Sequence, residues 1–331
     1  MRSRRAESID VNPERPALLD LPSPFVSEAA VLRLLESPDT RRDVLYERIV
    51  GGTYDKPYIL EDGELRHLCF GLSQTQSVMR LSNPYALDLA YTRQMMAFLL
   101  FNCQPRRIVL IGLGGGSIAK YCYRYLPGAR LTVVESDPNV IALRDEFLIP
   151  RDDFRFSVVH ADGAAYLAEL RRGVDVLLVD AFDRNGIPSS FGNVEFYTNA
   201  HRCLCSAGVF VMNLVGDRTA SLAHRDRIRE VFAEAAIAVP VEGDSNCLIF
   251  AHKHGSLEPR WKWLLWQARR LKELFGLEFP TYVQELKRCY DAELRWDVRR
   301  KESARAAVPD RSAVNEPAAL ESAPWSSTGN M

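Results

Sequence analysis

Residues 108 to 117 read IVLIGLGGGS, an apolar run that ends in a cluster of glycines. The run predicts a buried strand, and glycines let the chain turn with positive φ and let main-chain N–H groups approach a ligand closely. A second apolar run, LTVVE, ends in Glu135, 19 residues after Gly116. A carboxylate there can accept hydrogen bonds from both hydroxyls of a ribose. The pattern predicts a nucleotide site, with a purely structural βαβ turn as the alternative. Its expected contacts are Gly112, Gly114, Gly116 and Glu135.

Apolar runs and amphipathic segments continue to alternate as far as residue 252. We expect strands at 107–111, 130–135, 155–160, 174–179, 208–214 and 246–252. We expect helices between them at 116–125, 138–146, 163–171, 194–205 and 221–235, and one before the first strand at 84–102. Strands that alternate with helices at this spacing predict an α/β fold with a Rossmann-like, doubly wound and mostly parallel sheet.

The segments outside this alternation predict four further parts. Residues 31–80 contain VLYERIV, YILED and RHLCFGL, which are separated by turn signals and predict a small N-terminal β-meander. The Rossmann-like domain then spans 81–258, and helical patterns continue through 259–302. Residues 1–30 and 303–331 are polar or rich in Ala, Ser and Pro, so we expect disordered tails there.

The composition excludes several kinds of partner. Lys and Arg total 42 against 43 Asp and Glu, so the formal charge is −1. The chain therefore lacks the excess of positive charge that is typical of nucleic-acid-binding proteins. No signal peptide and no apolar run long enough to cross a membrane are visible. Seven cysteines without a CxxC pair favour reduced thiols in a cytoplasmic protein. We expect no metal, since His252 and His254 are the one close histidine pair and have no partner ligands nearby in sequence.

Acidic residues follow the expected strands at the edge where open parallel sheets bind ligands. Asp162 lies before Gly163 at a helix start, where it is either an N-cap or an acceptor for an adenine amino group, with the glycine leaving room for the ring. Asp180 and Asp183 follow the fourth strand in LLVDAFDRNGIP. A carboxylate at this point can accept a proton from a reacting group, although it can also merely cap the turn.

The order of these motifs resembles one family. GLGGGS, VESDPNVI, ADG and DAFDRNGIP follow one another as in the spermidine and spermine synthases, which are aminopropyltransferases on the class I methyltransferase fold. The likeness runs from about Val44 to His252 and includes DLAYTRQMM, the segment before the glycine strand. It implies a transferase of polyamine biosynthesis that works as a homodimer on a small-molecule amine.

The resemblance also implies a role for each candidate residue. Decarboxylated S-adenosylmethionine is then the co-substrate, with Glu135 on its ribose and Asp162 on its adenine. Asp180 is the base that takes a proton from the attacking amine. The implied contacts to that amine are Tyr91, Asp183 and Gln76. For Tyr91, a place in the hydrophobic core is an equally good interpretation.

The chain departs from the family pattern around the amine. The aspartate that the family carries in its glycine turn is replaced by Gly115, and Arg93 stands where the family has an acidic residue. These departures keep two alternatives open. One is a methyltransferase that uses intact S-adenosylmethionine, and the other is a non-catalytic relative that binds a nucleoside.

Overall fold

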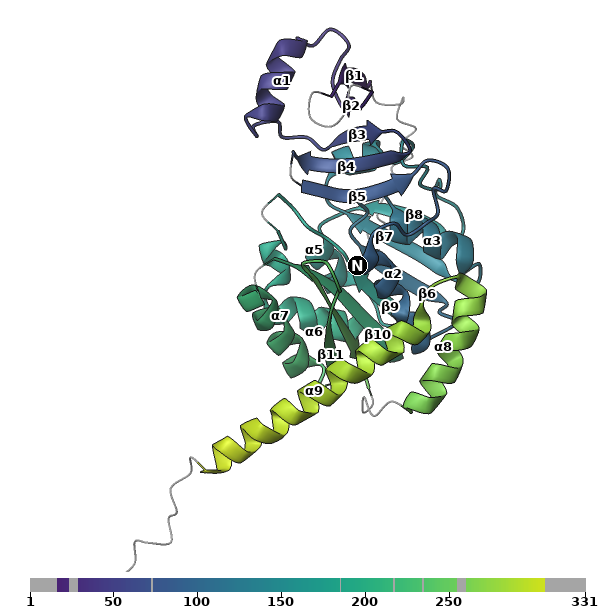
Figure 1. Ribbon diagram of the computed structural model, residues 1–331, viewed down its shortest axis with the longest axis vertical. Helices are drawn as coiled ribbons and strands as arrows, with labels where there is room; N and C mark the ends of the chain where they lie inside the picture. Colours follow the sequence, from purple (N-terminus) through teal and green to yellow (C-terminus); the bar gives the residue numbers. More distant parts are fainter. Residues whose placement is uncertain are drawn as a thin grey trace, which may run out of the picture. The chain divides into compact units, whose positions relative to one another are not determined.

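The computed structural model describes residues 17–23, 29–72, 74–184, 186–216, 218–233, 235–254 and 260–306. Its first sheet is antiparallel and comes from the N-terminal part of the chain, drawn in purple and blue in Figure 1. The strands lie in the order β1 (Leu19–Pro22), β2 (Val31–Leu34), β3 (Tyr58–Asp62), β4 (Leu65–Gly71) and β5 (Gln74–Arg80). β1 falls inside the expected N-terminal tail, most of which lies outside the described residues, as does most of the C-terminal one.

The second sheet has seven strands in the order β11-β12-β10-β9-β6-β7-β8. Their bounds are β6 (Arg107–Ile111), β7 (Arg130–Glu135), β8 (Phe156–His160), β9 (Val174–Val179), β10 (Leu204–Val215), β11 (Ala236–Pro240) and β12 (Asn246–His252). β12 runs antiparallel to both neighbours, and the pairs from β10 to β8 are parallel. The predicted α/β fold is therefore confirmed. Strand β11 was not predicted, because its run AIAVP directly follows a helical pattern without a turn signal.

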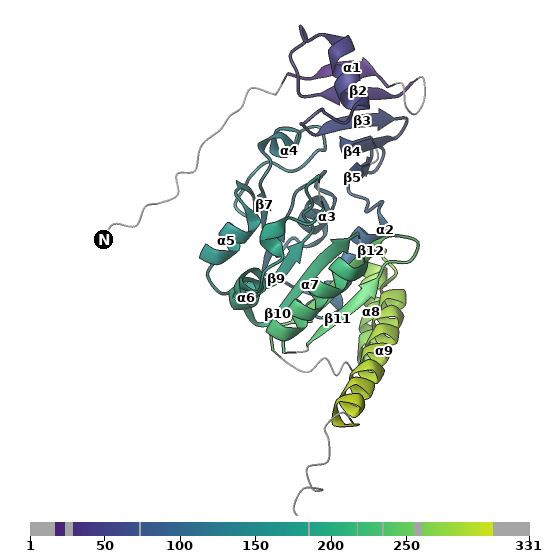
Figure 2. The same cartoon turned by 90° about the vertical axis from the view of Figure 1, so that its left-hand side faces the viewer.

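Helices cover both faces of this sheet (Figures 1 and 2). One face carries α5 (Gly163–Glu169), α6 (Val194–Cys203) and α7 (Arg218–Val231), which pack against one another. The other carries α2 (Ala90–Met95), the 3₁₀ turn η1 (Met96–Leu100), α3 (Ser117–Tyr125) and α8 (Trp261–Phe275). Short elements α4 (Pro138–Ala142) and η2 (Ser189–Phe191) complete the connections. Strands buried on both faces explain the near-continuous apolar runs RIVLI and VDVLLV.

Two segments differ from the sequence expectation. VLYERIV is not a strand but belongs to helix α1 (Arg42–Val50), because Leu45 and Ile49, four residues apart, both enter the core of the N-terminal sheet. Tyr46 of this helix donates to the Pro22 carbonyl. The helix expected at 84–102 begins at Ala90, because the Arg93 guanidinium binds the carbonyls of Leu87 and Asp88 and holds them outside it.

Buried polar contacts fasten the N-terminal sheet to the large one. Lys120 of α3 is fully buried, and its Nζ donates to the Phe147 carbonyl at 2.8 Å and contacts the Met79 sulfur of β5 at 3.0 Å. Burial lowers the pKa of Lys120 to about 8. Arg66 of β4 also donates to the Glu146 carbonyl beyond α4. The β5 edge is thereby held over the start of α3.

The C-terminal helices follow the large sheet. α9 (Phe279–Ala306) extends beyond Cys289, where one compact unit of the chain ends and a second begins at Tyr290. Within the first unit, Tyr121 of α3 donates to the Phe275 carbonyl and Gln94 of α2 donates to Glu285. No helix in the described part of the chain is long and apolar enough to cross a membrane.

Candidate active site

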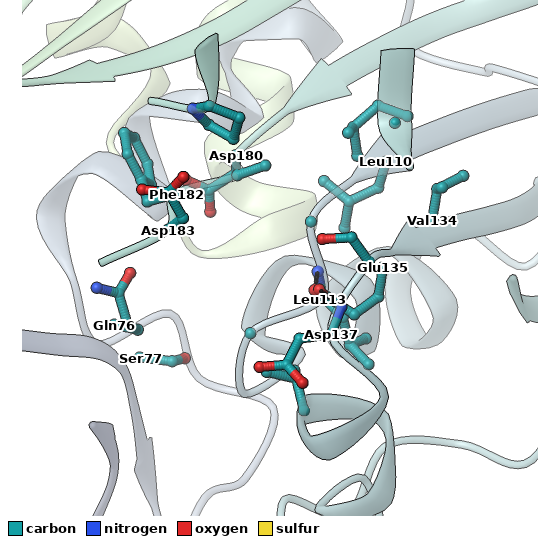
Figure 3. Close-up of a pocket in the computed structure, with 18 of the residues that line it drawn as sticks. Gln76, Ser77, Leu110, Leu113, Val134, Glu135, Asp137, Asp180, Phe182 and Asp183 are labelled. Atoms are coloured by element: carbon teal, nitrogen blue, oxygen red, sulfur yellow. Dashed lines mark hydrogen bonds between the residues drawn. The ribbon is translucent and has the colours of Figure 1, made fainter. Parts of the chain in front are cut away.

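A cavity of about 470 Å³ lies at the carboxyl ends of the central parallel strands, beneath the β5 edge. Ligands of open parallel sheets bind at this edge. The predicted site residues that line it are Gln76, Tyr91, Gly112, Gly114, Glu135, Asp162, Gly163, Asp180 and Asp183. In Figure 3, Asp180 and Asp183 lie on one side and Glu135 on the other, with Gln76 of the N-terminal sheet below. The cavity therefore has a glycine-turn side and an acidic side.

The glycine turn after β6 needs its glycines for different reasons. Gly112 has φ +98°, and a Cβ there would lie 2.1 Å from the Asp180 carbonyl oxygen. Gly114 also has positive φ, but no heavy atom lies closer than 3.9 Å to its Cβ position. Gly116 does not line the cavity, because it precedes α3 and faces Ile149, 2.5 Å from where its Cβ would be. Its glycine allows close packing instead of ligand contact.

Glu135 ends β7 with a side chain that is almost fully buried. One carboxylate oxygen accepts from the Leu113 N–H at 2.9 Å, and the other accepts from the Asp137 N–H at 2.8 Å. Two main-chain donors fix the orientation of the carboxylate, and each oxygen keeps a second lone pair. The group can therefore accept two more hydrogen bonds from a ligand in the cavity.

Asp162 caps helix α5, since its Oδ1 accepts from the Ala165 N–H at 2.8 Å. This N-cap was one of the two predicted roles, and the second carboxylate oxygen has no part in it. Gly163 is close-packed: a Cβ there would lie 2.4 Å from Ile111 and 3.0 Å from Phe191. Neighbouring side chains, and not only a ligand, therefore account for the glycine.

Asp180 follows β9 and is bound on both carboxylate oxygens. Oδ1 accepts from the Asn213 amide at 3.0 Å, and Oδ2 accepts from the Tyr91 hydroxyl at 3.3 Å. Burial raises the pKa of Asp180 to about 6, although the two hydrogen bonds oppose the shift. Burial and the neighbouring Asp180 carboxylate also raise the pKa of Tyr91, so this phenol stays protonated and donates. Tyr91 therefore lines the cavity next to Asp180 and is not only a core residue.

The loop after Asp180 connects to the N-terminal sheet. Asp183 exchanges main-chain hydrogen bonds with Gly186, which forms a tight turn at the cavity wall. The Arg184 guanidinium donates to the carbonyls of Tyr54 and Lys56, at 2.9 and 3.2 Å. It also lines the cavity, so one arginine stands beside the carboxylates.

The two departures from the family pattern lie in different places. Arg93 does not line the cavity, because its guanidinium binds the main-chain carbonyls of Leu87 and Asp88 instead. Gly115 lies against the N-terminal sheet. A Cβ there would stand 2.7 Å from the Ser77 hydroxyl, which also lies 3.3 Å from the Ser117 hydroxyl. The turn therefore offers hydroxyl groups where the family carries a carboxylate.

Asn213 is a site residue that was not predicted from the sequence. It lies in the middle of the apolar run VFVMNLV of β10, it is 1% exposed, and it donates to Asp180. Its amide also meets that of Asn246 on β12 at 2.8 Å. A lone polar residue in a buried strand needs a hydrogen-bond partner, and this signal could have identified it.

No three His, Cys, Asp or Glu side chains of the described residues are grouped so that they could hold a metal ion. His252 lies against the Phe101 ring, with 4.6 Å between ring centroids, and burial lowers its pKa to about 4. It is a neutral core residue.

Comparison with solved structures shows the same fold. A spermidine synthase from Thermotoga maritima matches with a TM-score of 0.55 and 19% identity, over 70% of this chain and 80% of that one. Human methyltransferase-like protein 13, crystallised with SAH, matches with a TM-score of 0.51 and 23% identity, over 57% of this chain and 93% of that one. Aminopropyltransferases and methyltransferases thus share this architecture.

Sequence comparison is more specific. A polyamine aminopropyltransferase from Chromobacterium violaceum is 37% identical over 230 residues, which are 69% of this chain and 88% of that protein. An eEF1A lysine and N-terminal methyltransferase from Xenopus laevis is 32% identical over 176 residues, but these are only 25% of its length and 48% of this chain. Residues 88–238 match the family model of the spermine/spermidine synthase domain. The chain therefore belongs to the spermine/spermidine synthase family.

Proposed function

We propose that this protein is an aminopropyltransferase that moves the aminopropyl group of decarboxylated S-adenosylmethionine to a small di- or polyamine. One observation carries the proposal: a carboxylate with a raised pKa, Asp180, faces the same cavity as Glu135. Family membership supports the same reaction, because a relative that is 37% identical and covered over 88% of its length is named for it. No metal enters the proposed chemistry.

The donor is bound by the glycine-turn side. Glu135, oriented by two main-chain N–H groups, accepts the ribose hydroxyls. The second oxygen of Asp162 accepts the adenine amino group beside Gly163. The open space at Gly114 and the close approach at Gly112 leave the turn without side chains over the nucleoside.

The acceptor is bound and deprotonated by the acidic side. Asp183, Gln76 and Tyr91 hold the amine, and Asp180 takes its proton. The freed nitrogen attacks the carbon next to the sulfonium, and the C–S bond breaks with its electron pair going to sulfur, which releases methylthioadenosine. A carboxylate with a pKa of about 6 is mostly ionised at pH 7 and is a stronger base than an ordinary one.

Methyl transfer from intact S-adenosylmethionine is the second candidate. One observation favours it: the glycine turn has Gly115 and two serine hydroxyls at the place where a carboxylate would hold the ammonium of the decarboxylated donor. Similarity to an eEF1A lysine and N-terminal methyltransferase over 48% of the chain agrees with it. In this case Asp180 would deprotonate a different amine.

Calorimetric titration with the decarboxylated donor, the intact donor and methylthioadenosine separates the candidates. Aminopropyl transfer requires tighter binding of the decarboxylated donor and turnover with a polyamine, whereas tighter binding of the intact donor would contradict it. The double variant Gly115→Asp/Ser77→Gly places a carboxylate in the glycine turn, as in the family pattern. The Ser77 change removes the hydroxyl that would clash with the new side chain. The double variant should increase the preference for the decarboxylated donor, with Ser77→Gly alone as the control. Binding of methylthioadenosine without turnover on either donor would instead support the non-catalytic alternative.

We also propose a cytoplasmic homodimer. No disulfide joins any of the seven cysteines, which suits a reducing compartment. Trp263 and Trp266 of α8 are about half exposed and offer apolar surface for a second copy. Light scattering of the purified protein at micromolar concentration tests the assembly, and a monomer mass would contradict it.

A further inference from the structure

A second cavity, of about 590 Å³, lies at the opposite edge of the seven-strand sheet from the active site. Arg107 begins β6, Arg130 begins β7, and Arg155 directly precedes β8. These strands are neighbours in the sheet, so their amino ends bring the three side chains to one edge. Arg106 lines the same cavity, and none of the nine lining residues is acidic.

None of these four arginines is held in a close ion pair. Within the described ranges of the chain, none of them forms a salt bridge, whereas Arg33, Arg48, Arg80 and others do. The carboxylates of this edge mainly accept main-chain hydrogen bonds: Asp175 accepts from the N–H groups of Arg106 and Arg107, and Asp153 accepts from that of Arg155. Asp153 also accepts from the Tyr123 hydroxyl and interacts electrostatically with Arg155 at longer range. Four positive charges therefore face one cavity in a chain whose formal charge is −1.

Part of the cavity is already ordered. The Arg155 guanidinium lies 3.6 Å from the centre of the Tyr123 ring and donates to the Tyr123 carbonyl at 2.7 Å. Its Nη1 is buried and has no hydrogen-bond partner among the described residues. Beside it, the Phe154 ring is 82% exposed at the cavity wall. A fixed guanidinium and an exposed aromatic ring stand next to each other.

The chemistry of such a cavity favours a multiply charged anion. Arginines that share a cavity without forming salt bridges repel one another, and an anion that binds between them relieves this repulsion. Guanidinium groups match phosphate oxygens in geometry and donate two parallel hydrogen bonds to them. We propose that this cavity binds the phosphate groups of a small polyphosphorylated molecule, either an inorganic polyphosphate or a nucleotide whose base stacks on Phe154.

Calorimetric titration of the full-length protein with inorganic tripolyphosphate and with uridine triphosphate tests this proposal. Uridine triphosphate is chosen because it lacks the adenine that the active site is proposed to bind. The double variant Arg106→Gln/Arg130→Gln removes two exposed charges and should weaken both ligands about ten-fold or more. Arg42→Gln, an exposed arginine of α1 outside the cavity, is the matched control and should leave both affinities unchanged.

Phe154→Ser distinguishes the two sources of phosphate. Weaker binding of uridine triphosphate alone identifies a nucleotide site, and unchanged binding of both ligands identifies an inorganic polyphosphate site. The proposal is overturned if neither ligand binds or if the double variant binds both as well as the native chain. It is also overturned if a single-stranded RNA of about 12 nucleotides binds more tightly than either ligand, because the edge would then be a nucleic-acid surface.

Discussion

The two sides of the active site are built in different ways. The glycine-turn side uses main-chain groups and Glu135 from consecutive segments of a single βαβ unit, and Asp162 joins it from the end of the next strand, β8. The acidic side collects Tyr91 from α2, Asp180 after β9 and Asn213 from β10, which are far apart in sequence. The first side is thus a local property of the chain, and the second exists only once the sheet has assembled.

The largest effect should come from Gly112→Ala, because Gly112 on the glycine-turn side packs against the Asp180 carbonyl on the acidic side. Its positive φ and the Asp180 carbonyl 2.1 Å from the new Cβ should cost roughly 3 kcal/mol or more of stability. Urea unfolding measures this loss. The control is Gly114→Ala, where φ is also positive but the space is open, so about 1 to 2 kcal/mol is expected. Equal losses for the two variants would contradict the close contact.

Asp180→Asn should separate the two sides by function. The change keeps the shape of the side chain but removes the charge that accepts a proton, so turnover should fall by about 10² to 10⁴-fold. Binding of methylthioadenosine should stay within a few-fold of the native value. Steady-state kinetics and calorimetry on the same preparation test both statements. Native turnover in this variant would exclude Asp180 as the base.

Glu135→Gln should have the opposite effect to Asp180→Asn, with weaker donor binding and little change in turnover. An amide there loses charge and turns a donor toward one of the two main-chain N–H groups that the carboxylate binds. Donor affinity should weaken about ten-fold or more, and turnover at saturating donor should change much less. Asp162→Asn serves for comparison, because asparagine retains the N-cap of α5 and should cost less. Equal donor affinity in Glu135→Gln and the native enzyme would remove Glu135 from the ribose site.

The smallest effect concerns pH. With Asp180 titrating at a pKa of about 6, kcat/KM should fall as the pH drops below about 6. Asn213→Leu removes a hydrogen bond that lowers this pKa. The acid limb of the kcat/KM profile, where activity falls with falling pH, should therefore move up by roughly half to one pH unit. Asn246→Leu breaks the same amide pair without touching Asp180, and it should leave the limb in place. A limb that moves equally in both variants would argue against a specific effect of Asn213.

The raised pKa of Asp180 also sets a trend in stability. The folded protein holds a proton on this group up to about pH 6, whereas the unfolded chain releases it near 3.8. The folded state therefore binds more protons between these values, and this group makes the protein less stable as the pH rises through that window. Asp180→Asn should flatten this part of the stability profile in urea unfolding at several pH values.

The contrast between the local glycine-turn side and the acidic side, which forms only when the sheet assembles, also explains what the sequence could predict. The glycine turn, Glu135 and the alternation of elements are periodic or local signals, and the predicted fold is confirmed. The helix at Arg42–Val50 was taken for a strand because its two core contacts, Leu45 and Ile49, are few among polar neighbours. Arg93 was placed at the amine because spacing alone does not reveal that its guanidinium caps Leu87 and Asp88. Asn213 was missed because its partner Asp180 lies 33 residues away.

The contact between Gly112 and the Asp180 carbonyl has a consequence for how this site tolerates change. A residue of the glycine-turn side is held to glycine by the main-chain atoms of Asp180 on the acidic side. In a saturation mutagenesis screen, position 112 should therefore behave like a catalytic position even when the donor is supplied in excess. Because the obstacle at 112 is main-chain atoms and not a side chain, no substitution at position 180 can make room for a larger residue there.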